Sequence, residues 1–260
     1  MTFEEYIRNP AGKGASNTPN KGMYEQYYTG ELDKLLLKVN GKIDYTLSAH
    51  GEKYYILFKI PHHTYDNFFY DVVIEFSANN NAIRVNPDLK GYDVKFFSND
   101  PSFTFTWAFA FNKSSLLIKE FKSKASPLSL KMNPTVRNPS ESTGYNKYIY
   151  YAFLLTKLYG LFEKSKYTLG GKPFSVLNNM VSSANAKFEE RKKKEEEYKK
   201  LPKGKKDNIE KQHVVNTVDN TDTSKLVSKT HKVQTTEKVA AVKRSNLIKN
   251  VTKVKRSKRI

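Results

Sequence analysis

The chain has 260 residues, of which 45 are Lys or Arg and 26 are Asp or Glu, so its formal net charge is +19. It contains no cysteine, which excludes disulfides, thiolate metal sites and a cysteine nucleophile. It has neither a run of about 18 apolar residues nor a secretory signal, so we expect a protein inside the cell without a membrane span.

The basic residues are concentrated at the C-terminal end. Residues 201–260 hold 16 basic and 5 acidic residues and no aromatic residue. Such a segment buries too little apolar surface to offset the entropy lost on ordering, which predicts a long disordered basic tail over 201–260. In residues 187–200, Glu189, Glu190 and Glu195 each precede a Lys by four positions, and Pro202 follows. This pattern predicts a charged helix over 187–200 that is solvated on all sides and acts as a spacer.

The first 40 residues predict two helices. Thr2 and Glu5 have the spacing of a capping box, which indicates a short helix that ends before Pro10. Residues 11–22 are rich in Gly, Ser, Asn and Pro and predict a loop. Residues 23–39 place Tyr and Leu on one side of a helix, which we expect Gly30 to interrupt.

The next part of the chain predicts antiparallel strands. Apolar and polar residues alternate over 42–48, and a β-rich run over 53–60 follows a turn, as in a hairpin. Residues 68–76 and 92–96 continue the strand pattern, with a polar turn at 78–81 between them.

An aromatic run follows, in which every second residue carries a ring: Phe103, Phe105, Trp107, Phe109 and Phe111. On a strand this spacing places all five rings on one face. A helix that starts at Asp100-Pro101 is the alternative, and we favour the strand. The rings are interpreted mainly as core, although such a face could also stack on nucleic-acid bases.

Helical patterns return after Lys113. Leu116, Leu117 and Phe121 fit one helical face that Ser126-Pro127 closes. Residues 145–163 carry a wide apolar stripe and form the clearest predicted helix, and Gly170-Gly171 separates it from residues 174–200. The sequence therefore predicts an α+β domain over residues 1–186, with an antiparallel sheet flanked by helices.

No motif for catalysis, cofactor binding or metal binding is found. His62 and His63 are adjacent and would point to opposite faces of a strand, so we interpret them as part of a solvated turn. Residues 11–16 and 170–173 contain Gly and Lys but lack the spacing of a phosphate-binding loop. Asp71 and Glu75 could face the same side of a strand and are interpreted as exposed carboxylates. We therefore predict no catalytic residue, no cofactor and no metal, and expect that the protein is not an enzyme.

The C-terminal end carries the one positive signal for binding. It holds eight cations without an acid: Lys243, Arg244, Lys249, Lys253, Lys255, Arg256, Lys258 and Arg259. Arms of this kind contact phosphates without reading base sequence, so these residues are our predicted nucleic-acid-binding site. Charge alone leaves DNA, RNA, an anionic membrane surface, an acidic protein surface and a merely solubilising role open.

Residues 69–76, 94–103 and 109–112 resemble proteins encoded by tailed bacteriophages of low-GC Gram-positive bacteria. The resemblance covers roughly residues 1–190, excludes the basic end and transfers no catalytic residue. It implies a virion or assembly component that contacts other virion proteins and uses its tail on DNA or an acidic partner. The alternative is a non-virion nucleic-acid-binding accessory protein of phage replication or transcription. Both place the protein in the host cytoplasm, and the first adds incorporation into the particle.

Overall fold

The structure, a computed structural model, describes residues 1–8, 21–78, 88–136, 138, 141, 143 and 146–202, without the side chains of residues 8 and 21–27. The chain divides into two units, Met1–Lys200 and Leu201–Ile260. Every element described below belongs to the first unit. The basic segment, predicted to be disordered, and the loop predicted over 11–22 lie almost entirely outside the described residues.

The first unit is built on a four-stranded antiparallel sheet in the order β1-β2-β3-β4. The strands are β1 (Tyr45–His50), β2 (Lys53–Pro61), β3 (Phe69–Ser77) and β4 (Asp93–Ser98), and the short 3₁₀ helix η1 (Leu89–Gly91) precedes β4. Each strand pairs with the next in sequence, and all three pairs are antiparallel. The predicted antiparallel sheet and the α+β class are confirmed.

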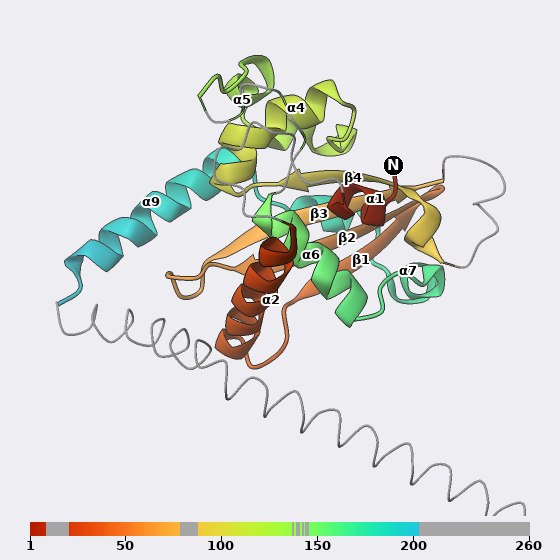
Figure 1. Ribbon diagram of the computed structural model, residues 1–260, viewed down its shortest axis with the longest axis horizontal. Coiled ribbons are helices and arrows are strands. Elements are labelled where there is room, and N and C mark those ends of the chain that lie inside the picture. The colour runs from red at the N-terminus through yellow and green to blue at the C-terminus, as the bar shows by residue number, and fades with distance from the viewer. Residues whose placement is uncertain are drawn as a thin grey trace, which may run out of the picture. The chain divides into compact units, whose positions relative to one another are not determined.

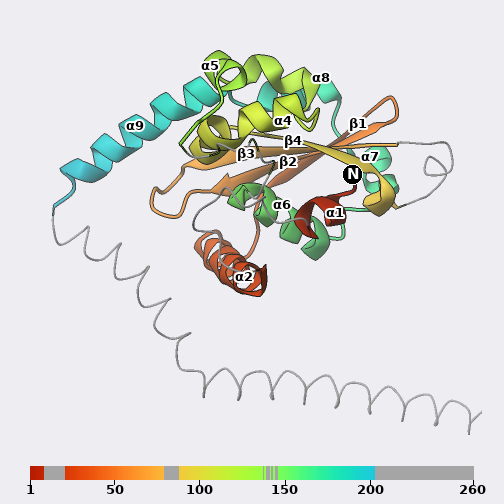
Figure 2. The ribbon, with the colours of Figure 1, turned by 45° about the horizontal axis from the view of Figure 1, so that its top comes forward.

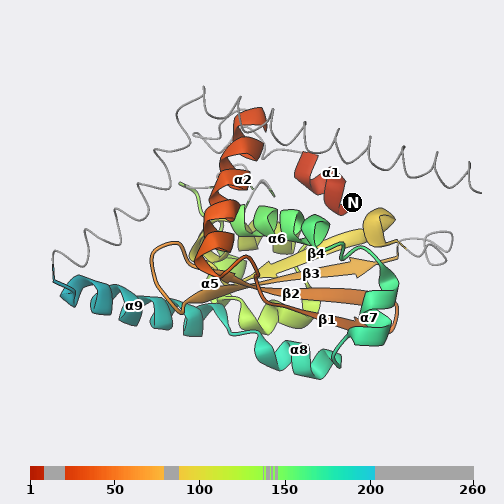
Figure 3. The same ribbon diagram turned by 90° about the horizontal axis from the view of Figure 1, so that it is seen from below.

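One face of the sheet is apolar and carries the larger part of the core. Its residues come from every second position of β2 and β3, and Ile56, Phe58, Val72, Ile74 and Phe76 are all fully buried. Helices α1 (Phe3–Arg8), α2 (Lys21–Lys38) and α6 (Lys147–Leu158) lie on this side of the sheet, as Figure 3 shows. The ring of Phe3 in α1 packs 5.0 Å from that of Phe153 in α6, and this contact joins the helices over the sheet.

The opposite face is covered by later elements, so the sheet lies between two helical layers. These are the 3₁₀ helix η3 (Lys119–Lys124), α8 (Phe174–Met180) and the start of α9 (Ala184–Lys200). In Figure 2, α8 and α9 lie on the side of the sheet opposite α2 and α6. Phe174 packs 4.6 Å from Tyr55 of β2, and Phe121 stacks 5.4 Å from Phe97 of β4.

The helix predictions near the N-terminus hold in outline. Thr2 N–H donates to the Glu5 carboxylate at 2.8 Å and Glu5 N–H donates to Thr2 Oγ1 at 3.2 Å, so the capping box is confirmed. The expected interruption at Gly30 is wrong, because α2 is continuous from Lys21 to Lys38.

The clearest predicted helix is present as α6, but it is shorter than the apolar stripe. Asn146 caps its start by accepting from two backbone N–H groups. At its end, Gly160 has a φ of 61°, and Gly160 and Leu161 donate to the carbonyls of Lys157 and Thr156. This is the pattern of a Schellman motif, which requires a left-handed residue and therefore favours Gly.

The aromatic run is helical, and the predicted strand is wrong. Residues Phe103–Trp107 form one turn of π-helix, η2, which continues as α4 (Ala108–Lys113). Phe103, Trp107 and Phe111 recur every four residues and are buried, whereas Phe105 is 46% exposed. Rings that recur at every second residue also include rings at every fourth residue, so the same sequence can form a helix with one buried aromatic face.

The helix predicted through Leu116, Leu117 and Phe121 is also corrected. Leu117 forms a parallel bridge to Phe96 beside β4, and only Lys119–Lys124 then turns into the 3₁₀ helix η3. Ser126-Pro127 starts a helix, α5 (Pro127–Lys131), rather than ending one. The bridge protects the outer edge of β4, where main-chain groups would otherwise lack partners.

Among the described residues, α6 is followed by α7 (Lys164–Gly170), α8 and α9, and Figure 1 labels α7 and α9. The stretch 174–200 is therefore divided into two helices that residues 181–183 separate. Among the described residues, no helix combines the length and apolarity that crossing a bilayer requires.

Candidate functional site

Polar side chains line the face of the sheet beneath α8. Ser48, Tyr55, Glu75 and Lys95 are cross-strand partners and form one row over all four strands. Asp71 lies on the same face as Glu75, as expected from their spacing. Both carboxylates are 0% exposed, so their interpretation as exposed residues is wrong. The cause is tertiary, because η3 and α8 cover this face.

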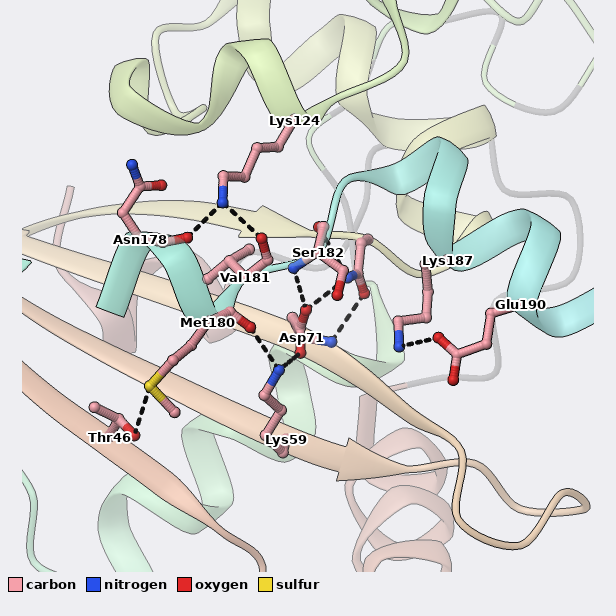
Figure 4. Close-up of polar contacts among 11 residues, drawn as sticks. Thr46, Lys59, Asp71, Lys124, Asn178, Met180, Val181, Ser182, Lys187 and Glu190 are labelled. Carbon is pink, nitrogen blue, oxygen red and sulfur yellow. Dashed lines mark hydrogen bonds and ion pairs between the residues drawn. The ribbon is translucent and has the colours of Figure 1, made fainter. Parts of the chain in front are cut away.

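Asp71 is the centre of a hydrogen-bond network that joins three parts of the chain (Figure 4). Lys59 Nζ lies 2.6 Å from Oδ1 of Asp71. Oδ2 accepts from Asn99 Nδ2 and from the backbone N–H of Ser182, both at 2.8 Å. A buried carboxylate needs such a set of donors, because each one offsets part of its desolvation.

Two lysines bind the main chain of the same connection. Lys59 Nζ also donates to the carbonyl of Met180 at 2.7 Å. Lys124 Nζ donates to the carbonyl of Val181 at 2.6 Å and to that of Asn178. Burial lowers the pKa of Lys124, and the charge of Asp71 opposes this shift.

We call this arrangement the latch: the side chains of Lys59, Asp71, Asn99 and Lys124 together with the main chain of residues 178–182. It holds the connection between α8 and α9 against the sheet through side-chain hydrogen bonds. The latch therefore fixes the position at which α9 begins. Residues 201–260 follow α9 directly in the sequence.

A second charged group lies further along the same face. Lys53 Nζ is 2.8 Å from a carboxylate oxygen of Glu120 and 3.3 Å from one of Glu75, and Lys95 Nζ is 3.8 Å from Glu75. Burial alone would lower the pKa of Lys53, but the hydrogen bond to Glu120 and the charge of Glu75 raise it. Two carboxylates and two ammonium groups balance one another, which is typical of a structural ion-pair network.

Three buried oxygens of the row Ser48, Tyr55, Glu75 and Lys95 have no hydrogen-bond partner among the described residues, and neither has one oxygen of the neighbouring Glu120. These atoms are Ser48 Oγ, Tyr55 Oη, Glu75 Oε1 and Glu120 Oε2. Burial and the nearby carboxylates raise the pKa of Tyr55, so its hydroxyl keeps its proton. A phenol that stays protonated and carboxylates that are paired with lysines do not form an acid and base pair for catalysis.

A third buried carboxylate, Asp100, organises the start of the helical aromatic run. It accepts from Ser98 Oγ at 2.8 Å, from the N–H of Phe103 at 2.9 Å and from Asn146 Nδ2. Burial raises the pKa of Asp100, and these hydrogen bonds oppose the shift. Because Asn146 also caps α6, Asp100 joins the first turn of η2 to the first turn of α6.

The two histidines lie in a partly buried turn rather than a solvated one. His62 Nδ1 accepts from the N–H groups of Thr64 and Tyr65 at 3.1 and 3.2 Å, and its ring stacks 4.5 Å from that of Tyr65. Burial, with a smaller contribution from nearby cations, lowers the pKa of His62 to about 3. His62 is thus neutral over the physiological range. In the part of the chain that the structure describes, no group of three or more His, Asp or Glu could hold a metal ion.

Helix α9 is not solvated on all sides. Lys187 is buried, with its Nζ 5.1 Å from the centre of the Phe68 ring, and Tyr198 packs 6.0 Å from Tyr65. The expected ion pair between Glu195 and Lys199 is present at 2.9 Å. The other ion pairs within α9 join residues that are three positions apart in the sequence.

The glycine-containing segment 170–173 is bound to the sheet edge. The N–H of Lys172 donates to the carbonyl of Leu47 in β1 at 2.7 Å. A cleft of about 500 Å³ lies beside it, between β1 and α7. Lys166 lines this cleft, and its Nζ donates to the carbonyls of Gly160 and Tyr159.

The eight cations predicted to bind nucleic acid lie outside the described residues, as does the segment 11–16. Sequence reasoning missed the latch, although two acids inside an apolar strand were its visible signal. The described arrangement can anchor a helix and neutralise buried charge. Compared with protein-family models, with curated proteins and with solved structures, the chain has no match in any of the three.

Proposed function

We propose that this protein works by binding and not by catalysis, as a structural or assembly protein of a bacteriophage particle. Its folded unit makes contacts with other virion proteins, and its basic C-terminal segment contacts DNA or an acidic partner. The observation that carries the proposal is the uneven charge. The 60 residues after α9 hold a net charge of +11, with eight cations and no acid over residues 243–260.

The folded unit supports this proposal through the latch. In this proposal, the latch fixes the start of α9, the helix that leads to the basic segment. Hydrogen bonds donated by Lys59 and Lys124, and one accepted by Asp71, hold the main chain just before α9. Among the described residues, the buried carboxylates of Asp71, Glu75 and Asp100 each bind a hydrogen-bond donor or an ion-pair partner, which is typical of polar groups with a structural role.

The second candidate is a non-virion nucleic-acid-binding accessory protein of phage replication or transcription. The same cations favour it, because phosphate contacts alone do not require a particle. Mass spectrometry of purified particles separates the two candidates. A fixed stoichiometry in particles supports the structural role, and presence only in infected cells supports the accessory role.

DNA binding is tested by changing the eight cations of residues 243–260 to Gln in the full chain. The matched control changes the eight lysines of residues 203–238 to Gln, which removes the same charge from the same segment. Binding to duplex DNA is followed by fluorescence anisotropy at several salt concentrations. Each phosphate that the protein neutralises adds about −0.9 to the slope of log affinity against log salt.

We expect the terminal variant to lose several units of slope and the control to lose less. Shuffling the DNA sequence should change little, because phosphate contacts carry no base information. If both variants keep the affinity and slope of the unchanged chain, nucleic acid is removed from the proposed partners. Equal losses in the two variants would show that total charge, and not the terminal cluster, governs binding.

A further inference from the structure

The face of α9 that packs against the rest of the folded unit carries the cation Arg191. Such a position normally holds an apolar residue or one with an ion-pair partner. Lys187, Arg191 and Tyr198 are separated by four and seven residues, so they share one side of the helix. Lys187 and Tyr198 contact Phe68 and Tyr65 of the connection between β2 and β3. Arg191 lies between them and therefore faces the same connection.

Arg191 is partly buried there and forms no ion pair among the described residues, while the charge of Glu195, one turn further along α9, acts on it from a distance. Its Nε is buried and has no hydrogen-bond partner among the described residues. Its guanidinium interacts with the side chain of Tyr70, and its charge acts on His62, Tyr148 and Lys147. Unpaired donors of a guanidinium are costly in a partly buried position unless an anion accepts them.

Lys147 brings a second cation to the same place. It is the first residue of α6, it is partly buried, and its Nζ lies 5.0 Å from the ring of Tyr148. Burial lowers the pKa of Lys147, and the charge of Arg191 adds to this effect. The ring of Tyr148 packs 4.9 Å from that of Tyr70, so the two cations border one pair of tyrosines.

No carboxylate within the described residues forms an ion pair with Arg191 or Lys147. The charges of Asp100 and Glu31 act on Lys147 from a distance. Asp100 is occupied by Ser98, Phe103 and Asn146, as described above. Glu31 pairs with Lys34 at 2.8 Å and lies 3.5 Å from His63.

We propose that Arg191 and Lys147 form a binding site for a phosphate group, with the rings of Tyr70 and Tyr148 at its border. An oxyanion accepts from the guanidinium in the forked geometry that arginine offers. It also relieves the repulsion between two half-buried cations. The N-terminal end of α6, a helix of 12 residues, adds a favourable dipole at the same place. This site lies in the first unit and is independent of the cations over 243–260, so either proposal can fail alone.

The test measures the melting temperature of the full chain in phosphate-free buffer as inorganic phosphate is added at constant ionic strength. The variants are Arg191→Gln and Lys147→Gln, and the matched control is Lys193→Gln, an exposed residue on the same helix. Ligand-induced shifts are compared rather than absolute melting temperatures, because Arg191→Gln also alters a contact with Tyr70. A nucleoside monophosphate and a short oligothymidylate are titrated in parallel.

We expect phosphate to raise the melting temperature of the unchanged chain and the control by about 3 °C at ten times the dissociation constant. Either site variant should bind about tenfold more weakly or worse. The ligand with the highest affinity among the three shows whether the bound phosphate group comes from the free ion, from a nucleotide or from a nucleic-acid backbone. The absence of a shift, or an equal shift in all four proteins, would overturn the proposal.

Discussion

Replacing Asp71 by Ala should be among the most destabilising single changes in the folded unit. The change leaves Lys59 Nζ, Asn99 Nδ2 and the N–H of Ser182 without their common acceptor. Two of these donors are uncharged groups that bind a fully buried carboxylate, and each such hydrogen bond is worth about 1.5–3 kcal/mol. Their sum is about 3–6 kcal/mol, which agrees with the roughly 3–5 kcal/mol lost when a buried pair loses one partner.

Two further substitutions separate the contributions within the latch. Asp71→Asn keeps one acceptor oxygen and should cost less than Asp71→Ala. Lys59→Met leaves Asp71 with two donors and removes a side chain that is 29% exposed, so we expect a loss of about 1–3 kcal/mol. The matched control is Lys194→Met, which breaks a pair with Glu197, a residue that is 66% exposed, and should cost under about 1 kcal/mol.

The assay is urea unfolding of the full chain at constant pH, in which a lower midpoint with an unchanged slope reports lost stability. Hydrogen exchange gives a local readout, because the amide of Ser182 should exchange faster in Asp71→Ala than in the control. A loss under about 1 kcal/mol for Asp71→Ala, equal to that of Lys194→Met, would refute the assignment of Asp71 as the centre of the latch.

Three further changes test other parts of the description. Trp107→Ala should cost about 3–5 kcal/mol in urea unfolding, and Phe105→Ala, at 46% exposure, about 1 kcal/mol; equal costs would contradict the helical placement of the aromatic run. The pKa of His62 is about 3 when folded and near 6.5 when unfolded, so protons bind the unfolded state first and stability falls as the pH drops through that window. His62→Asn keeps a side-chain acceptor for the backbone N–H groups and does not titrate. Between pH 6.5 and 5, the unchanged chain should lose about 1–2 kcal/mol more stability than this variant; parallel pH profiles would count against this. Thr2→Ala removes the acceptor for Glu5 N–H and should lower stability by about 1 kcal/mol in the same assay, unless the capping box contributes nothing.

The local patterns of the sequence predicted most elements of the fold, because strands, caps and long amphipathic helices leave short-range signals. The four strands, the capping box at Thr2 and the helix α6 were all recognised from spacing. The aromatic run was misread because Phe103, Trp107 and Phe111 satisfy a period of two and a period of four. The cap provided by Asp100 was the signal that favoured the helix.

The candidate site was harder to predict, because its burial depends on distant parts of the chain. Asp71 and Glu75 are buried by η3 and α8, and the partner of Asp71 at Ser182 lies 111 residues away. No window of neighbouring residues contains that information. The C-terminal cations were predicted from charge alone, and that prediction concerns residues beyond those that the structure describes.

The latch also has a mechanical consequence. Tension along α9 is transmitted to the rest of the unit through its own side-chain contacts and through residues 178–182. At that connection the load is shared by Lys59 on β2, Asp71 on β3, Asn99 just after β4 and Lys124 on η3. Because these anchors lie on three adjacent strands and a helix, no single strand bears the force alone.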